Sequence, residues 1–385
     1  MNPTTIDRAD RPVGASVGSG GPDSRLASPR TMAHLRTLAA GHVDGYADLA
    51  TASPVDPTPQ HLLRAIAASD PAPGYPSTHG SVRLRTSVVE WLRRYRGIEG
   101  LGPQHVVPTI GSKEFLGLLP FLLDIRAGDI VVVPELGYPA YVDGATAVGA
   151  TIIAEDDPAR WPEHTRLIWI NTPRNPDGRT LQHADLRRAV DRARELGAVL
   201  VSDECYGVLN EVDGQRIPSI LHAESNGGSL EGILMSSSVS KQSNLAGYRV
   251  GYSVGDPELI EALITRRRRL GLIMPWPQQA LLEAALVDDV DVRTQRSRHR
   301  ERIARLRPAV EAAGLRVTGS TDGMYVWATA DEDGWATATR LAARGVLCMP
   351  GDVFGAAGRR HVRFAVSIHD DRLEQAVERL RALAA

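Results

Sequence analysis

The fold of this 385-residue chain is indicated most directly by the stretch Ser236-Ser237-Ser238-Val239-Ser240-Lys241-Gln242-Ser243-Asn244-Leu245-Ala246-Gly247-Tyr248-Arg249. It sets Lys241 in a hydroxyl-rich turn, eight residues before Arg249. Lys241 is one of only two lysines among the 44 basic residues, and the other is Lys113. Arginine stays charged in proteins, whereas lysine can lose its proton and act as a nucleophile. A chain that uses arginine almost everywhere but keeps lysine here indicates that an amine is needed.

An amine beside hydroxyl groups and a guanidinium is typical of a site for a phosphate-bearing aldehyde. Lys241 would form a Schiff base with the aldehyde, and Ser238 and Arg249 would hold the phosphate. The stretch therefore predicts pyridoxal 5'-phosphate as the cofactor. Lys113 is the alternative amine, but its place in the first turn of a predicted helix favours a role facing solvent or the phosphate.

Composition and charge narrow the class of protein. Apolar content of 43% and charged content of 23% are ordinary globular values. A net charge of -2 argues against a nucleic-acid partner, despite the run Arg266–Arg269. Cys205 and Cys348 form no disulfide framework. No apolar stretch resembles a signal peptide or reaches the roughly 20 residues of a membrane span. We expect a cytoplasmic protein with no membrane contact.

Outward from this stretch, short apolar runs alternate with amphipathic helices from about residue 75. The runs expected as strands cover 106–110, 129–133, 151–154, 167–170, 198–202, 232–236 and 249–254. Helices are expected at 31–40, from 60, from 112, and over 139–148, 186–196 and 258–269. This alternation predicts an α/β fold, with a parallel sheet covered by helices on both faces.

The last third of the chain has a different pattern. A Pro-rich turn at Met274–Pro277 leads into a long helical stretch that is expected to run to about residue 313. Beyond it, strands are expected at 315–317, 325–328 and 361–365, and helices at 335–344 and 371–382. The predicted division is a flexible arm with the start of a small domain (1–45), a large cofactor-binding domain (46–270), and a connecting helix with a small α+β domain (271–385). In the arm, Gly18–Gly21 follows no strand and lacks GxGxxG spacing, which argues against a dinucleotide-binding dehydrogenase.

Ligands of such sheets bind beyond the carboxyl ends of the strands, where several polar residues fall. Asp203 ends an apolar strand, where a carboxylate is costly unless paired, and a pyridinium nitrogen would be a partner. Tyr206 could donate to the ring oxygen O3'. Gly111-Ser112 offers free N–H groups to a phosphate, and Tyr138 could stack on a planar ring. Arg363 could clamp a carboxylate. Each feature alone is more often a turn, a core aromatic or a buried ion pair.

Three motifs together are far more specific. Asp203-Glu204-Cys205-Tyr206, Ser238-Val239-Ser240-Lys241 and Asn244-Leu245-Ala246-Gly247-Tyr248-Arg249-Val250-Gly251 resemble the fold-type-I, class I/II aminotransferases in order and spacing. The resemblance runs from about residue 45 to the end. It implies a large domain with a mostly parallel central sheet flanked by helices, plus a smaller α+β domain. It also implies transfer of an amino group between an amino acid and a 2-oxo acid.

The resemblance assigns roles by position. It implies that Lys241, Asp203 and Tyr206 are catalytic. The implied cofactor-binding residues are Gly111, Ser112, Lys113, Tyr138, Asn175, Asp203, Tyr206, Ser238, Lys241, Arg249 and Tyr75. The implied substrate-binding residues are Arg363, Ala52, Asn175, Gln242 and Trp276. Tyr75 is similar to a tyrosine that reaches the partner subunit's phosphate, which implies a homodimer with shared active sites. No metal is expected.

A narrower resemblance concerns the substrate. Residues 53–57, 74–80, 110–114 and 134–139 are similar to actinobacterial N-succinyldiaminopimelate aminotransferases of lysine biosynthesis, which use glutamate and N-succinyl-2-amino-6-oxopimelate. Four residues depart from that pattern: Ala52 replaces the usual Gly, Gln242 the usual Arg, Trp276 a small residue and Asp177 the usual Thr.

These departures leave an alternative open: a paralog of specialised metabolism that uses the same cofactor and lysine on another amino acid. Such an enzyme could catalyse elimination, replacement or cyclisation in place of transamination. A ligand-sensing regulator is disfavoured, because the 45-residue arm is too short and too rich in Gly and Pro for a DNA-binding module.

Overall fold

The computed structural model describes residues 30–69, 74–209, 211–212, 215–319 and 323–383. A seven-stranded sheet forms its centre, in the order β2-β10-β9-β6-β5-β3-β4. These strands are β2 (Val106–Thr109), β3 (Ile130–Val133), β4 (Thr151–Ala154), β5 (Thr165–Asn171), β6 (Val199–Asp203), β9 (Ile233–Ser238) and β10 (Gly251–Gly255). The α/β class predicted from the alternation of strands and helices is confirmed. Most of the predicted arm, including Gly18–Gly21, lies outside the described residues.

The strand directions differ from the prediction in one respect. β4, β3, β5, β6 and β9 are mutually parallel, as expected. β10 runs antiparallel to both β9 and β2, so the sheet is mixed. β9 and β10 are joined by the turn that carries Lys241, and this connection contains no α-helix that could cross the face of the sheet, so the chain returns beside β9 in the opposite direction.

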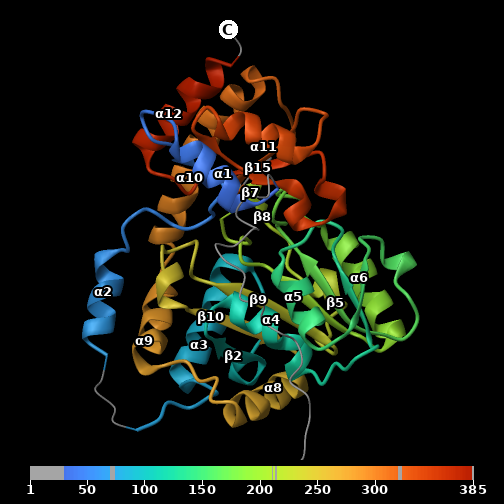
Figure 1. The fold of residues 1–385 in the computed structure, drawn as a ribbon. Helices are drawn as coiled ribbons and strands as arrows, with labels where there is room; N and C mark the ends of the chain where they lie inside the picture. Colours follow the sequence, from blue (N-terminus) through green and yellow to red (C-terminus); the bar gives the residue numbers. More distant parts are fainter. Residues whose placement is uncertain (1–29, 70–73, 210, 213–214, 320–322, 384–385) are drawn as a thin grey trace, which may run out of the picture.

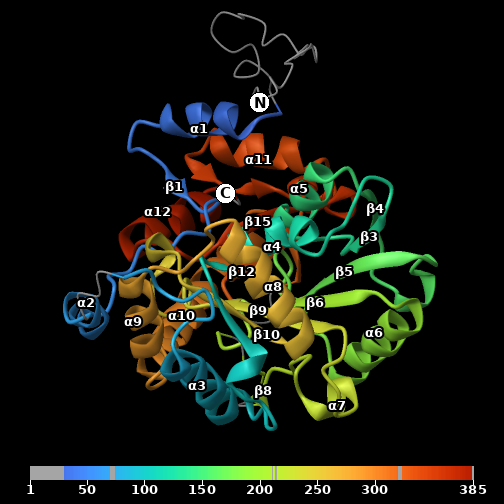
Figure 2. The same cartoon turned by 90° about the horizontal axis from the view of Figure 1, so that it is seen from below.

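Alternation along each strand sends side chains to two separate cores. In β5, Ile168 and Ile170 pack on one face, while Leu167 and Trp169 pack on the other. The first core includes side chains of α2 (Gln60–Ala67), α3 (Val82–Trp91), α6 (His183–Leu196) and α9 (Trp276–Ala285). The second includes side chains of α4 (Ser112–Leu122), α5 (Ala140–Ala147) and α8 (Pro257–Arg269). Helices therefore cover both faces of the sheet, as Figures 1 and 2 show.

A smaller four-stranded antiparallel sheet lies at the top of Figure 1. Its strands are β11 (Arg316–Gly319), β12 (Tyr325–Thr329), β14 (Met349–Pro350) and β15 (Val362–Ala365). The helices beside it are α1 (Met32–Ala40), α11 (Gly334–Ala342) and α12 (Asp370–Arg381). β1 (Ala47–Asp48) pairs in parallel with β13 (Val346–Leu347), and Leu35, Leu49 and Phe364 belong to one core. Residues from the two ends of the chain thus build one body, while the exact domain boundaries stay a prediction.

The long helical stretch predicted after residue 277 is two helices, α9 and α10 (Val290–Ala312). α9 ends at Ala285 with Leu286 as its C-cap, and the Asp288 carboxylate accepts a hydrogen bond from the Val290 N–H at the start of α10. The shorter elements include a π-helical turn over Leu92–Arg96, α7 (Ala223–Asn226), and the hairpin β7 (Glu211–Val212) with β8 (Gln215–Arg216). Within the described ranges, no helix combines the length and apolarity needed to cross a bilayer.

Candidate active site

Polar residues gather at the carboxyl ends of the parallel strands, as the sequence predicts. Asn171 ends β5, Asp203 ends β6 and Ser238 ends β9, while Gly111 and Tyr138 follow β2 and β3. Adjacent parallel strands end at the same edge of a sheet, so these residues share one side of the molecule. The small sheet contributes Arg363 from β15 to the same place.

Lys241 lies in the turn after β9, and its Nζ donates a hydrogen bond to the Ala52 carbonyl. Burial is the main reason that the pKa of Lys241 is lowered to about 8, and the guanidinium groups of Arg363 and Arg249 lower it further. The Lys241 amine therefore loses its proton far more readily than a solvated lysine. Ala52, which was predicted as a substrate-side residue, lies directly against it.

Asp203 is a buried carboxylate, 4% exposed, without a cationic partner among the described residues. It accepts hydrogen bonds from the Tyr141 hydroxyl at 2.6 Å and the Cys205 N–H at 3.1 Å. Burial raises the pKa of Asp203, although both hydrogen bonds oppose this shift. Sequence reasoning missed Tyr141. Tyr141 lies in the first turn of α5, three residues after Tyr138, and the two rings meet edge to face with centroids 6.0 Å apart. This spacing is the signal that could have found it.

Arg363 is 4% exposed and is held in a polar frame. Its Nη1 donates to Asn175 Oδ1 at 2.8 Å and its Nη2 to the Ala50 carbonyl at 2.7 Å, while its Nε has no partner. The guanidinium carbon lies 4.5 Å from the ring centroid of Tyr325 and 4.8 Å from that of Phe354. The two rings hold the guanidinium plane in position. Two residues predicted to bind substrate, Arg363 and Asn175, are thus brought together.

Tyr206 and Tyr325 form a second pair that links the two sheets. Their hydroxyl oxygens lie 2.6 Å apart, and their rings meet edge to face with centroids 5.5 Å apart. Burial raises the pKa values of both tyrosines, so both keep their protons at neutral pH. Tyr325, which the sequence did not single out, contacts both Arg363 and the predicted catalytic Tyr206.

Gly111 and Arg249 form a cradle at the N-terminus of α4. Gly111 has φ of +76°, and a Cβ added there would lie 2.4 Å from Arg249 Nη2. Glycine is therefore required for this backbone and for the close approach of the guanidinium. Ser112 is the first residue of α4 and Ser238 the last of β9, and both hydroxyls lie near the buried Cys205 thiol, whose pKa is raised by burial. Hydroxyls, a guanidinium and free N–H groups at a helix start suit a phosphate.

Four predicted site residues lie differently. Lys113 is exposed, with its Nζ 5.8 Å from the Tyr138 ring centroid. Gln242 is 1% exposed, and its Nε2 has no partner. Trp276 Nε1 donates to the Gly74 carbonyl at 3.0 Å, and the adjacent Tyr75 is 96% exposed. Among the hydrogen bonds and ring contacts of the described residues, none joins these four side chains to Lys241.

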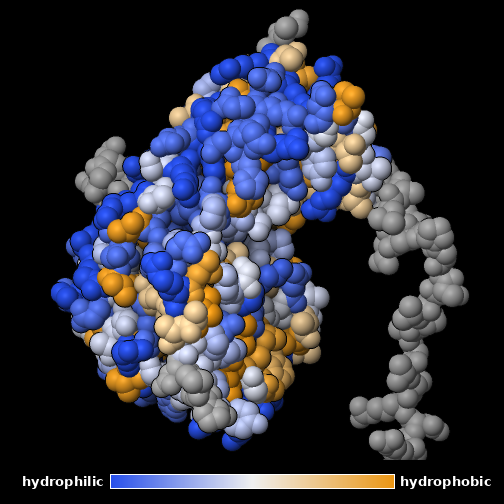
Figure 3. All heavy atoms as spheres, turned by 90° about the vertical axis from the view of Figure 1, so that its left-hand side faces the viewer, coloured by the Kyte–Doolittle hydropathy of each residue, from blue (hydrophilic) through white to orange (hydrophobic). Residues whose placement is uncertain are grey.

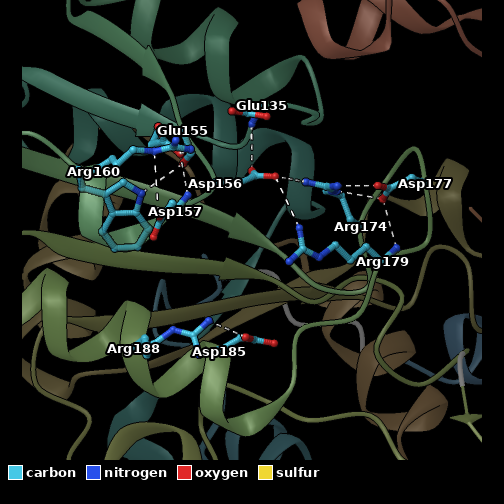
Figure 4. A network of polar contacts seen from close by, with 11 residues as sticks. Glu135, Glu155, Asp156, Asp157, Arg160, Arg174, Asp177, Arg179, Asp185 and Arg188 are labelled. Carbon is cyan, nitrogen blue, oxygen red and sulfur yellow. Dashed lines mark hydrogen bonds and ion pairs between the residues drawn. The ribbon is translucent and has the colours of Figure 1, made fainter.

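Asp177, the departure from the expected Thr, has a partner in Arg174. Arg174 Nε and Nη2 donate to the two carboxylate oxygens of Asp177 at 2.9 and 2.5 Å, and its Nη1 donates to Asp156 at 2.6 Å. Figure 4 shows Arg174 between these two carboxylates. The resulting network fixes the loop that carries Asn175. The Gly319 backbone of β11 also packs closely on this loop, because a Cβ there would lie 2.5 Å from the Asp177 carbonyl.

These residues fit pyridoxal 5'-phosphate. The buried Asp203 carboxylate lacks the cation that a protonated pyridine nitrogen would supply. The cradle at Gly111 suits the phosphate, and Lys241 offers an amine with a lowered pKa. The central mixed sheet, its helical layers and this set of residues define a fold-type-I enzyme dependent on pyridoxal phosphate.

Comparison with known proteins identifies the family. The family described as aminotransferase class I and II matches residues 44–380, and the chain belongs to it. A probable aminotransferase of Mycobacterium tuberculosis is 43% identical over 96% of this chain and 88% of its own length. The 4-dedimethylamino-4-oxo-anhydrotetracycline transaminase OxyQ of Streptomyces rimosus is also 43% identical, over 89% of this chain and 95% of its own length. The structure of N-succinyldiaminopimelate aminotransferase from M. tuberculosis superposes with a TM-score of 0.82 at 25% identity, covering 94% of this chain and 99% of that one. The predicted family and cofactor are confirmed.

Proposed function

We propose that this aminotransferase takes its amino group from an α-amino acid, with glutamate the first candidate, and passes it to an oxo group of a second substrate. The observation that supports this most directly is the placing of Lys241. Its amine, with a pKa lowered to about 8, lies within electrostatic reach of Arg363, the proposed carboxylate clamp. An amine able to move a proton near a carboxylate clamp suits proton transfer at the α-carbon of an amino acid.

The residue roles follow from these contacts. Lys241 would hold pyridoxal phosphate through its Nζ and, once displaced by the substrate amine, would move the α-carbon proton. Pyridoxal phosphate, when bound, supplies an electron sink for the bonds at the α-carbon and a carbon that carries the amino group. Asp203 would bind the protonated ring nitrogen, with Tyr141 holding its carboxylate in place. Tyr206 and Asn175 would face the ring oxygen O3'.

The remaining proposed contacts position the two ligands. Gly111, Ser112, Ser238 and Arg249 would hold the phosphate, and Tyr138 would stack on the ring. Arg363 would bind the substrate α-carboxylate, a role supported by its unpartnered Nε and its place between two rings. A bidentate carboxylate would complete the guanidinium's hydrogen bonds and fix the α-carbon relative to Lys241.

Two classes of acceptor are compatible with the family. The likeness to N-succinyldiaminopimelate aminotransferases supports N-succinyl-2-amino-6-oxopimelate of lysine biosynthesis, whose three carboxylates call for several cations. The 43% identity to OxyQ supports a ketone on a specialised metabolite. Gln242 favours the second class, because it places a neutral, buried side chain immediately after Lys241, where a cation was expected.

We further propose a homodimer with shared active sites. Tyr75 is 96% exposed, and Phe121 of α4, Val142 of α5 and Leu270 after α8 are 57%, 43% and 49% exposed. α4 is in contact with α5 and α8, and large apolar side chains exposed on neighbouring helices indicate a contact surface. Figure 3 views the side that carries α2 and α9; in its lower half, hydrophobic colour gathers mainly toward the right, beside hydrophilic areas, while the upper half is mainly hydrophilic. Tyr75 would reach the cofactor phosphate of the partner subunit.

Half-reactions test the proposal. Glutamate added without an acceptor to the cofactor-loaded protein should convert the aldehyde form of the cofactor to its amine form, which changes the absorption spectrum. The two acceptor classes are then added separately to the amine form, and recovery of the aldehyde spectrum identifies the substrate. If no amino acid produces the amine form, transamination is wrong and elimination, replacement or cyclisation must be assayed. Lys241→Ala should abolish the borohydride-reducible cofactor linkage, and Lys113→Ala should keep it; the reverse would make Lys113 the lysine.

A further inference from the structure

Two histidines and a glutamate face one another where α6 meets α7, outside the candidate active site. His183 is the first residue of α6, His222 caps α7, and Glu224 lies in the first turn of α7. One possible ligand atom from each side chain lies within 4.8 Å of the other two. α6 and α7 are in contact, and Figure 2 shows them beside each other at the edge of the large body. Neither helix contributes a residue to the candidate active site.

A buried hydroxyl fixes the orientation of His183. Its Nδ1 lies 2.7 Å from the Oγ of Ser225, a residue that is fully buried. The other ring nitrogen, Nε2, lies 3.9 Å from Glu224 Oε2. A metal-ligating histidine is typically held in this way, with one nitrogen in a hydrogen bond and the other directed at the ion. The separation of Nε2 from the carboxylate oxygen exceeds that of a hydrogen bond and leaves room for an ion to lie between them.

His222 supplies the second imidazole. Its ring centroid lies 4.9 Å from that of His183, at an interplanar angle of 45°. Its Nδ1 accepts a hydrogen bond of 3.3 Å from the Glu224 N–H. This hydrogen bond is long and would be lost on metal binding. Nδ1 of His222 would then carry the ring proton, and Nε2 would bind the ion. The Glu224 side chain is 69% exposed, so its carboxylate is free to turn toward both rings.

We propose that His183, His222 and Glu224 bind one Zn²⁺ ion, which joins the start of α6 to α7. Two neutral imidazoles and one carboxylate suit Zn²⁺, whereas Mg²⁺ prefers a set of oxygen ligands. Ligand atoms about 2.0–2.1 Å from a tetrahedral Zn²⁺ lie roughly 3.3 Å from one another. The cluster must therefore contract, and the exposed Glu224 supplies that movement. Water would occupy the fourth position.

The spacing of these residues explains why the sequence alone predicts no metal site. His222 and Glu224 form only an H-x-E triplet, and His183 comes from a different helix. No recognised zinc motif has this pattern. Only the contact between α6 and α7 brings the three ligands together.

Calorimetric titration of Zn²⁺ into the dialysed, cofactor-loaded protein tests the proposal. We expect one ion per chain with micromolar affinity, and a weakening by tenfold or more in His183→Gln, because even outer-shell partners of metal ligands are worth about 10–100-fold. Ser225→Ala, which frees the His183 ring, should weaken binding within that range. His164→Asn is the matched control: it removes an exposed histidine at φ of +65°, where asparagine is tolerated, and should leave binding unchanged.

Two results would overturn the Zn²⁺ site. Unchanged affinity in His183→Gln would place the ion elsewhere, and displacement of Zn²⁺ by equimolar Mg²⁺ would indicate a non-specific acidic surface. Circular dichroism of each variant checks that α6 and α7 remain folded. Titration of Co²⁺ in place of Zn²⁺ gives an independent readout, because its visible absorbance intensifies in a site of low coordination number and should do so only while His183 is present.

Discussion

Lys241 combines burial with two nearby guanidinium groups, and its titration is the first consequence at the scale of single residues. With a pKa of about 8, against 10.5 for an ordinary lysine, about one-tenth of the amine is neutral at pH 7 and about nine-tenths at pH 9. In cofactor-free protein labelled with ¹³C-lysine, two side-chain signals are expected, because the chain has two lysines. The Lys241 signal should titrate with a midpoint near 8.

Lys113→Arg identifies the Lys241 signal by leaving it as the only one. A midpoint above 10 would contradict the geometry around Ala52 and Arg363.

The lowered pKa of Lys241 also makes the stability of the cofactor-free protein depend on pH. Between the folded pKa near 8 and the unfolded value of 10.5, the unfolded chain binds more protons at this site than the folded chain. Lys241 should therefore make the cofactor-free protein more stable as pH rises through this window.

Tyr141 is proposed to act through Asp203, and its hydroxyl can be removed without changing the ring. Tyr141→Phe leaves the buried Asp203 carboxylate with the Cys205 N–H as its remaining donor. Losing a hydrogen bond to a buried charge costs about 1–3 kcal/mol, so kcat should fall about tenfold. Tyr252→Phe is the control, because Tyr252 of β10 is also buried, while the hydrogen bonds to the Asp203 carboxylate come from Tyr141 and Cys205. Equal losses of kcat in both variants would assign Tyr141 a structural role only.

At the scale of helices and strands, periodicity predicted most of the large sheet to within one or two residues, because its strands are bounded by turn residues and alternate with amphipathic helices. Periodicity carries no information on direction, so the reversal of β10 was not predictable from it. It also missed the break between α9 and α10, because Leu286 and Val287 continue the apolar pattern across it.

Within the candidate site, the motifs around Lys241 and Asp203 could be predicted from the sequence, because the residues of each motif lie within a single turn. Tyr325 and the Ala50 carbonyl could not be predicted. Tyr325 reaches Arg363 through the pairing of β12 with β15, and the Ala50 carbonyl reaches it only when the segment after β1 packs against the small sheet. No local sequence pattern records either contact.

Asp56 anchors that segment to α10. Arg302, with a side chain 2% exposed, donates to both carboxylate oxygens of Asp56, at 2.8 and 3.0 Å. Thr58 Oγ1 donates to the Asn244 carbonyl at 3.1 Å, which ties the same segment to the Lys241 turn. The Ala50 and Ala52 carbonyls, which face Arg363 and Lys241, lie between these anchors and β1.

Asp56→Asn should therefore affect both stability and substrate binding. Breaking a buried ion pair costs about 3 kcal/mol in the free energy of unfolding, and KM for the amino donor should rise as the Ala50 carbonyl loses its fixed place beside Arg363. Asp370→Asn is the matched control. Its carboxylate also binds Arg302 but is 61% exposed, so the loss should stay below about 1 kcal/mol. Equal losses in urea denaturation would contradict the anchoring role.

At the scale of the whole molecule, the active site is built where two bodies meet. Asp203, Lys241 and Arg249 belong to the seven-stranded sheet and its turns, while Arg363 and Tyr325 belong to the small antiparallel sheet. The hydrogen bond of Arg363 to Asn175 crosses between the two bodies, whereas its hydrogen bond to the Ala50 carbonyl lies within the small one. A change in their relative position would move the proposed carboxylate clamp relative to Lys241, which makes substrate binding sensitive to the junction.

The proposed homodimer adds a third contributor, Tyr75 of the neighbouring chain, and mixing two inactive variants tests it. Tyr75→Phe retains Lys241 but would lack the hydroxyl donated to its partner, while Lys241→Ala retains Tyr75. In a heterodimer of the two, one site receives both intact residues and the other neither. Random reassociation makes half of the dimers mixed, so activity should return to about a quarter of the native value. Mixing Lys241→Ala with Asp203→Asn is the control. Lys241 and Asp203 of one site come from the same chain, so each site of this mixed dimer lacks one of the two residues and no activity should return. Recovery with Tyr75→Phe but not with Asp203→Asn requires a site shared between chains, whereas no recovery in either mixture would confine each site to a single chain.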